Sequence, residues 1–244
     1  MWRELGPGLR FTLAFTVLTG LVYPLAMTGV GELLFPRQAN GSLMRVDGAV
    51  VGSSLIGQGF TQPQYFQPRP SDAGAGYDAT RSGGSNLGPT SARLFLGAVK
   101  AVNGKTTVVF DGIEDRLVHY CLENGLPYTA SQPLRRFEDA DGRLDDVRLI
   151  EAFRDRKHPL VFRAEVPIPA DAVTGSASGL DPDISPANAA LQLARVARAR
   201  GVVPAALRPL LARYTQAPTF GLLGEARVNV LEINLALDRR FPLH

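Results

Sequence analysis

Residues 11–35 read FTLAFTVLTGLVYPLAMTGVGELLF, and no charged residue stands between Phe11 and Gly31. An uncharged run of about 20 residues is what a helix needs to cross the ~30 Å hydrocarbon core of a membrane. Since lipid offers no water to the backbone, a single crossing must satisfy its backbone groups as a helix. The sequence therefore predicts a short tail over residues 1–10, one transmembrane helix over 11–35 and a soluble domain over 36–244.

Two other structures would leave a similar apolar run. A core helix of a soluble protein is one, although uncharged runs of this length are uncommon in such cores. A cleaved signal peptide is the other, but its apolar region usually spans about 7–15 residues and precedes a small-x-small cleavage site. Here Leu33-Leu34-Phe35-Pro36 follows the run instead. We therefore favour a retained membrane anchor.

Small or polar residues recur at every fourth position of this segment: Thr12, Thr16, Gly20, Pro24 and Thr28. Membrane helices associate through small residues that let backbones approach and through hydroxyls that bond across the interface. The spacing predicts a partner-facing transmembrane stripe, called here the small-residue stripe, and Pro24 is expected to kink the helix. The alternative is a lone anchor whose threonines donate back to carbonyls of their own helix.

Basic residues flank the run on both sides, with Arg3 and Arg10 before it and Arg37 and Arg45 after it. Together with the amino terminus, the preceding side carries slightly more positive charge. The positive-inside rule then places the N-terminus in the cytoplasm and the bulk of the chain outside it.

Charge and cysteine content exclude some classes of protein. The chain has 244 residues and a net charge of +3 without a long basic run, so a nucleic-acid partner is not indicated. Cys121 is the single cysteine, so no disulfide can form within the chain. About 205 residues follow the anchor, which is enough for one good core or two small ones.

The remainder of the chain predicts an α+β domain after the single N-terminal transmembrane helix. A β-hairpin is expected over 42–56 because Asp47-Gly48 separates two apolar runs. A long packed loop over 57–89 follows. Further on, we expect helices over 90–102, 111–124 (capped by Asp111), 144–156, 185–200 and 204–214 (interrupted by Pro209), strands over 105–110 and 160–166, and a segment over 228–238 that fits both periods.

Two loops carry residue types that bind ions. The glycine-rich segment 82–86 could hold a phosphate on backbone N–H groups, but it lacks the Lys-Ser/Thr ending of a phosphate loop, so a structural loop is favoured. Ser178, Asp181 and Asp183 could suggest a cation site, yet they do not fit the spacing of a calcium loop. Turn and cap chemistry is the favoured interpretation there.

No catalytic or metal-binding residue is predicted. His119 and Cys121 stand two apart on a predicted helix, so their side chains point in different directions and would not share a metal. Arg195, Arg198 and Arg200 lie near a predicted helix C-terminus, where cations complement the helix dipole, and a solvated or partner-facing surface is expected for them.

Ordered sequence blocks run from the anchor nearly to the end of the chain. They are LTGLVYPL at 18–25, LFP at 34–36, QANGSL at 38–43, GSSLIGQ at 52–58, RPS at 69–71, SGGSNLGP at 82–89, ASGLDP at 177–182, ISP at 184–186, RVARARG at 195–201 and VNVL at 228–231 with Asp238. In these blocks the chain resembles the C subunits of the Kdp potassium-transporting ATPase, the KdpC family. From about 102 to 165 it carries an atypical insert, where that family usually has a much shorter connection.

The resemblance implies a non-catalytic subunit of a P-type, inner-membrane complex that hydrolyses ATP to import potassium at high affinity. The implied partners are the ATPase subunit, a potassium-channel-like subunit and a small accessory subunit, all in membrane lipid. The family is also described as a catalytic chaperone that assists assembly and raises the ATP affinity of the ATPase subunit through a transient ternary complex. No tightly bound cofactor is expected, and no nucleotide-binding residue is assigned.

The predicted topology constrains that role. An extracytoplasmic domain lies across the membrane from ATP, so any effect on ATP would pass through the membrane helices, while a direct effect would fall on assembly or potassium import. The competing hypothesis is a stand-alone, membrane-anchored extracytoplasmic enzyme or binding protein. It would need a convergent catalytic site, and the sequence offers none.

Overall fold

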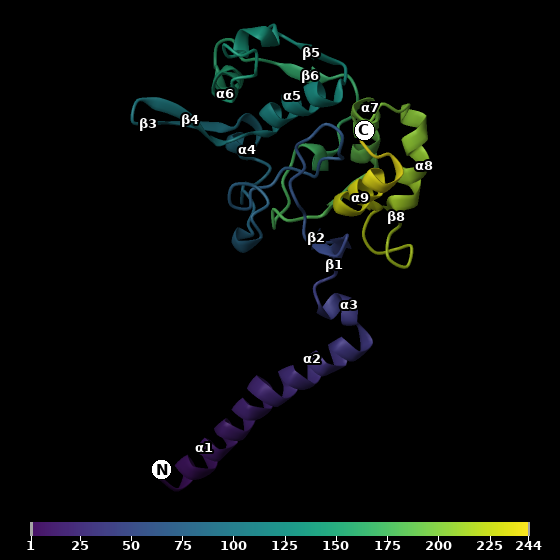
Figure 1. The fold of residues 1–244 in the computed structure, drawn as a ribbon. Helices are drawn as coiled ribbons and strands as arrows, with labels where there is room; N and C mark the ends of the chain where they lie inside the picture. Colours follow the sequence, from purple (N-terminus) through teal and green to yellow (C-terminus); the bar gives the residue numbers. More distant parts are fainter. Residues whose placement is uncertain (1, 244) are drawn as a thin grey trace. The chain divides into compact units, whose positions relative to one another are not determined.

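The computed structural model of the chain describes residues 2–243. Met1 and His244, the outer ends of the predicted tail and of the predicted soluble domain, lie outside the described residues. The chain divides into two compact units, Met1–Leu55 and Ile56–His244. A long apolar N-terminal helix precedes a region of mixed helices and strands (Figure 1), which confirms the predicted fold class.

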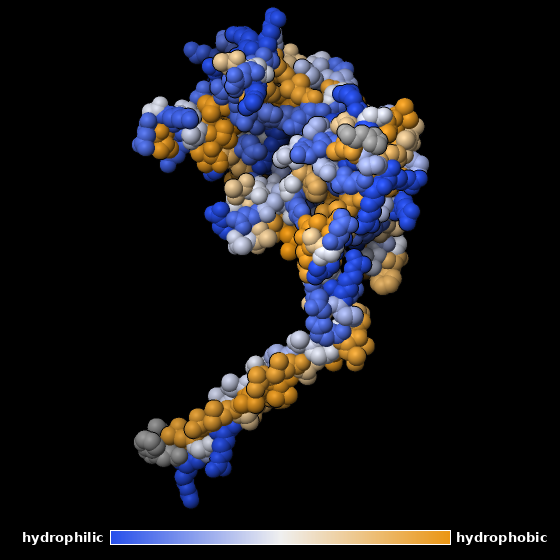
Figure 2. Space-filling model, viewed as in Figure 1, coloured by the Kyte–Doolittle hydropathy of each residue, from blue (hydrophilic) through white to orange (hydrophobic). Residues whose placement is uncertain are grey.

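The first unit is dominated by a helix built from three consecutive segments: α1 (Trp2–Val17), the π-helical η1 (Leu18–Val22) and α2 (Tyr23–Leu34). The stretch Arg3–Leu34 is long and apolar enough to cross a membrane, and its most apolar part is not buried by the described residues. Figure 2 shows apolar side chains covering much of this helix. The helix begins at Trp2, so the predicted tail is itself helical and continuous with the crossing.

The first unit ends in the hairpin that the sequence predicts. After the short helix α3 (Pro36–Ala39), strand β1 (Leu43–Val46) pairs antiparallel with β2 (Ala49–Ser53). Asp47 and Gly48 both have positive φ, at 51° and 82°, which matches the tight turn that suits the right-handed twist of paired strands.

The C-terminal half of the second unit forms the larger core. Strand β9 (Arg227–Asn229) pairs antiparallel with β7 (Asp183–Ile184) on one side and β8 (Thr215–Gln216) on the other. Helices α7 (Pro186–Ala199), α8 (Pro204–Tyr214) and α9 (Val230–Arg240) pack their apolar faces together, and Phe66 from the long loop joins them.

Two expectations for this core are decided by the structure. Residues 228–238 contain both elements that the pattern allowed, because β9 ends at Asn229 and the Asn229 side chain caps α9 by accepting from the Glu232 N–H. The expected interruption of the 204–214 helix at Pro209 is wrong, since α8 continues through it. The predicted helix start at Ser185-Pro186 is confirmed, with Ser185 Oγ accepting from the Asn188 N–H at 3.1 Å.

A second, smaller core is built from the middle of the chain. The elements of this part of the chain are α4 (Ala92–Leu96), β3 (Ala98–Val102), β4 (Lys105–Phe110), α5 (Ile113–Asn124), β5 (Tyr128–Ala130), α6 (Asp146–Arg154) and β6 (Phe162–Ala164). Short 3₁₀ turns lie at Ala79–Arg81, Leu134–Phe137 and Ala170–Ala172. Strand β5 pairs with β6, and Figure 1 shows this pair beside α5 and α6. Buried apolar side chains of α5, α6 and β6 pack together here.

The predicted helix over 90–102 is wrong in its second half. Helix α4 stops at Leu96, and Gly97 adopts φ 71° with ψ −176°, a conformation that glycine tolerates and that cannot continue a helix. Residues 98–102 instead form β3, which pairs with β4 across the turn Asn103-Gly104. The missed pattern is this Asn-Gly pair between two segments that contain β-branched residues, which is a hairpin signature.

The predicted cap of the 111–124 helix is also wrong. Gly112 occupies the N-cap position of α5, and no side chain caps it. The Asp111 carboxylate accepts instead from the Arg116 guanidinium, with two contacts of 2.9 Å. The helix does end as expected, at Gly125.

Candidate functional site

All five residues of the small-residue stripe are solvent-exposed among the described residues. Their placement on a partner-facing surface stays a prediction. Within the chain, Thr28 Oγ1 donates to Pro24 O at 2.8 Å, which is the back-bonding that the lone-anchor alternative expects. The Thr28 hydroxyl oxygen can still accept a hydrogen bond from a second helix.

The π-helical segment accommodates Pro24, which follows it by two residues. Proline has no N–H and crowds the carbonyl four residues earlier, so it disrupts a regular α-helix. Here the Tyr23 N–H donates to Leu18 O, five residues back, and the widened turn absorbs the disruption. A π turn holds more than 3.6 residues, so the four-residue steps through Gly20 come close to whole turns. The middle of the small-residue stripe is therefore straighter than in an uninterrupted α-helix.

In the second unit, the loop that contains the block at 69–71 is bound to the loop that contains the block at 177–182. The Arg69 guanidinium contacts Asp181 Oδ2 at 2.9 Å and donates to the carbonyls of Thr174 and Gly175 at 3.2 Å. Asp181 Oδ1 also accepts from the Asp183 N–H at 3.0 Å. These contacts support the turn chemistry expected for this acidic segment.

The glycine-rich segment 82–86 also packs against the acidic loop. The Gly83 N–H donates to Ser178 O at 2.9 Å, and Ser82 Oγ donates to the same carbonyl at 3.0 Å. A side chain at Gly84 would lie 2.9 Å from Ala177 O. The segment thus directs donors at its own protein, which supports the structural interpretation over a phosphate site.

The surface predicted for the arginines of α7 is wrong for two of the three. Arg195 is buried and donates to Asn124 Oδ1, Gln192 Oε1 and the carbonyls of Pro63 and Tyr65, at 2.6–3.0 Å. These contacts hold the long loop against α7 and α5.

Arg200, the C-cap residue of α7, is buried in a similar way. It contacts Asp238 Oδ1 at 2.7 Å and donates to the carbonyls of Gln64 and Phe241 at 2.9 and 2.7 Å. Only Arg198 of the three is exposed to solvent. Sequence reasoning missed this because a guanidinium can be buried when the fold supplies acceptors for its fixed fork of donors.

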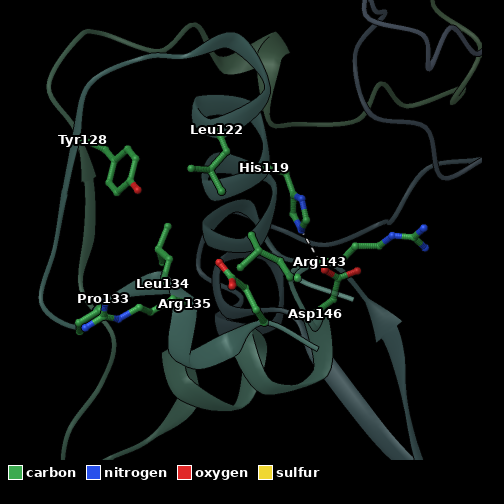
Figure 3. Close-up of a pocket in the computed structure, with 11 residues that line it drawn as sticks. His119, Leu122, Tyr128, Pro133, Leu134, Arg135, Arg143 and Asp146 are labelled. Carbon is green, nitrogen blue, oxygen red and sulfur yellow. Dashed lines mark hydrogen bonds and ion pairs between the residues drawn. The ribbon is translucent and has the colours of Figure 1, made fainter. Parts of the chain in front are cut away.

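The middle of the chain brings together three potential ligands. Asp115 and His119 stand four residues apart on α5 and so share a face, while Asp146 is the first residue of α6. One ligand atom from each lies within 4.8 Å of the others. His119 Nε2 is 2.8 Å from Asp146 Oδ1, and Figure 3 shows these two side chains pointing toward one another.

The environment perturbs the titration of both α5 groups. Burial raises the pKa of the Asp115 carboxyl to about 7. The hydrogen bond with Asp146 raises the pKa of His119, against the opposing effect of burial. His119 and Asp146 line two cavities of about 760 and 710 Å³, and Asp115 also lines the second. The group is therefore reachable from solvent.

Sequence reasoning had considered His119 only with Cys121, and it expected these two side chains to point in different directions. Cys121 is buried in the apolar core of α5 and α6. The i, i+4 spacing of Asp115 and His119 was the signal available in the sequence. Asp146 is 27 residues from His119, so its approach depends on how α6 packs.

The family model for "KdpC: K+-transporting ATPase, c chain" matches residues 5–107 and 144–239. The potassium-transporting ATPase KdpC subunit of Mycobacterium tuberculosis (strain ATCC 25618 / H37Rv) is 44% identical over 239 residues, covering 98% of this chain and 100% of that protein. The proteins of the same name from Gemmatimonas aurantiaca and Caulobacter sp. (strain K31) are 45% and 42% identical, over 98% and 100% of this chain and 94% and 97% of theirs. The two matched ranges leave residues 108–143 between them, inside the predicted insert.

Proposed function

The chain belongs to the KdpC family of c chains of K+-transporting ATPases, and on this premise we propose that it is the non-catalytic subunit of a potassium-import complex. It assembles with an ATPase subunit, a potassium-channel-like subunit and a small accessory subunit. The observation that carries the proposal is the match to named subunits over nearly the whole chain. The stand-alone enzyme or binding protein is not favoured, because that match includes the anchor and the folded region together.

The long helix supports a role inside a membrane complex. Its apolar length fits a single crossing, and the small-residue stripe offers a surface that a neighbouring helix can approach closely. We place the helix in the cell (inner) membrane, with the N-terminus in the cytoplasm and the second unit on the extracytoplasmic side. The side before the helix carries a slight excess of positive charge, from Arg3, Arg10 and the amino terminus, which supports this orientation.

The proposed effect on turnover is that of a catalytic chaperone. The chain raises the affinity of the ATPase subunit for ATP through a transient ternary complex. With the second unit outside the cell, this effect reaches the nucleotide site through contacts between membrane helices. In this proposal ATP binds the ATPase subunit, and the chain itself carries no tightly bound cofactor.

Assembly is tested by co-purification from native membranes in mild detergent, with an affinity tag after residue 244. We expect stoichiometric recovery of a large ATPase chain and a pore-forming chain. Recovery of this chain alone, under conditions that keep other membrane complexes intact, would overturn the subunit proposal. The chaperone step is tested separately, by measuring the ATP concentration that half-saturates ATP hydrolysis with and without this chain. We expect this concentration to be lower when the chain is present. An unchanged value in an assembled complex would overturn the chaperone step only.

The orientation is tested with a membrane-impermeant maleimide on intact cells. Val203 is 66% exposed at the N-cap of α8, and the native Cys121 is fully buried, so Val203→Cys adds one reactive thiol over a low background. Labelling of Val203→Cys without permeabilisation is the expected result. Labelling only after permeabilisation would place the second unit in the cytoplasm.

A further inference from the structure

The Asp115–His119–Asp146 group contains one carboxylate oxygen that the described residues leave unsatisfied. Asp115 is only 3% exposed, and its Oδ1 accepts no hydrogen bond from any residue between 2 and 243. A buried polar atom without a partner costs roughly 1–3 kcal/mol, and more for a charged group, so such atoms are rare in folded proteins. An unsatisfied carboxylate oxygen beside a second carboxylate and an imidazole points to an absent cation.

The neighbouring arginine does not supply that cation. Arg116 follows Asp115 directly, but its guanidinium is bound to Asp111 at 2.9 Å and to Asp72 at 3.2 Å. The hydrogen bond between His119 and Asp146 accounts for those two groups and leaves Asp115 unexplained. Metal binding displaces protons from its ligands, and with both carboxylates ionised and the imidazole neutral the three side chains carry a charge of −2, which a divalent cation balances.

We propose that Asp115, His119 and Asp146 bind a divalent transition-metal cation, with Zn²⁺ as the best fit. Imidazole nitrogen suits zinc and its neighbours in the first transition row, whereas magnesium and calcium prefer oxygen alone. Potassium is coordinated by shells of carbonyl oxygens, so the site is not one for a transported potassium ion. The site goes beyond the proposed subunit function and does not depend on it.

Binding needs a modest adjustment of the distances. In a tetrahedral zinc site with bonds of about 2.0–2.2 Å, ligand atoms lie roughly 3.3–3.6 Å apart, so a pair at 4.8 Å would close by about 1.2–1.5 Å. Rotation of the half-exposed Asp146 carboxylate would contribute to this movement. Water from the cavity of about 710 Å³ can take the remaining coordination position.

The metal would join α5 to α6. Two ligands come from α5 and the third from the first turn of α6, so binding would fix the packing of these helices within the middle of the chain. Because a bound ion stabilises only the folded state, its binding free energy adds to the stability of this region. We therefore assign the site a structural role in the segment between α5 and α6.

The test uses the full chain in mild detergent, stripped of metal with a chelator and carrying a histidine-free tag. Calorimetric titration with ZnCl₂ is expected to show one zinc per chain, and saturating zinc to raise the unfolding temperature by on the order of 5 °C. Asp115→Asn and His119→Gln should each weaken zinc binding by at least about tenfold. Asp146→Asn, at a half-exposed position, repeats the test with the least risk to folding.

The matched controls are His158→Gln and Asp141→Asn, which alter an exposed histidine and an exposed aspartate outside the group. Both should bind zinc like the parent. Co²⁺ supplies a direct readout: bound cobalt should give visible ligand-field bands without the near-ultraviolet band of a thiolate ligand, since Cys121 is not a ligand. Absence of binding at millimolar zinc, equal loss in His158→Gln, or full binding in all three site variants would overturn the proposal.

Discussion

Replacing the buried guanidinium of Arg195 tests how the long loop is held in the second unit. Arg195 is 5% exposed and donates to Asn124 Oδ1 at 3.0 Å, Gln192 Oε1 at 2.6 Å and the carbonyls of Pro63 and Tyr65 at 2.8 and 2.9 Å. Burial lowers the pKa of this group, against the effect of nearby acidic groups. In Arg195→Met the apolar stem remains while all four hydrogen bonds are lost.

The magnitude follows from the groups left behind. The carbonyls of Pro63 and Tyr65 and the buried Asn124 Oδ1 each lose a donor, at a cost of about 1–3 kcal/mol each, while Gln192 Oε1 still accepts from the Gln67 N–H. Removing the guanidinium also removes the cost of burying it, which offsets part of this loss. We expect a net destabilisation of about 3 kcal/mol. For a folded region of this size, that corresponds to a fall of about 6–12 °C in the unfolding temperature.

Thermal unfolding of the full chain in mild detergent, followed by circular dichroism, measures this fall. Arg198→Met is the matched control, because Arg198 lies on the same helix with its side chain in solvent. Its effect should stay within about 0.5 kcal/mol. A fall of less than about 2 °C in Arg195→Met, or equal falls in the two variants, would refute the assignment of the loop's stability to Arg195.

Three further predictions follow from other parts of the chain. Gly179→Ala should destabilise the second unit, because the added Cβ would lie 2.6 Å from Gly83 O. The loss should exceed that of alanine at a positive-φ glycine in open space by about 1–3 kcal/mol, and chemical unfolding measures the difference. Thr16→Leu and Gly20→Leu should each reduce co-purification with partner chains, because a larger side chain keeps a second helix at a distance. Cys121 should react with a maleimide only after unfolding, because its side chain is fully buried, and mass spectrometry of labelled protein checks this.

Each of these has its own control and contrary outcome. Gly142→Ala shares the positive φ but meets open space, so equal destabilisation would contradict the steric argument for Gly179. Val17→Leu enlarges a side chain next to the small-residue stripe without entering it, and unchanged co-purification of the Thr16 and Gly20 variants would remove the stripe as an interface. Rapid labelling of folded Cys121 would show that the α5–α6 core opens readily.

Local patterns predicted the elements whose causes are local. The uncharged run at 11–31 predicts the helix because its length and apolar composition are properties of that one segment and need no distant partner. Asp47-Gly48 predicts the hairpin, and Ser185-Pro186 predicts the start of α7, because each places the needed backbone angle or capping hydroxyl next to its element.

The failures arise where local preferences compete or where a partner is distant. Residues 98–102 suit a helix in composition, yet pairing with β4 and the positive φ of Gly97 make them a strand. Asp111 resembles a helix cap, but the Arg116 guanidinium offers its carboxylate a charge-assisted pair.

The sequence by itself determined the membrane-compatible helix, the α+β class and the family, because these depend on patterns and ordered blocks within the chain. Only the tertiary structure decided that Arg195 and Arg200 are buried and that Asp146 meets Asp115 and His119. The acceptors of Arg195 include carbonyls more than 100 residues away, at Pro63 and Tyr65. Whether a charged side chain faces solvent or a partner depends on the packing of distant segments, and no local pattern encodes that packing.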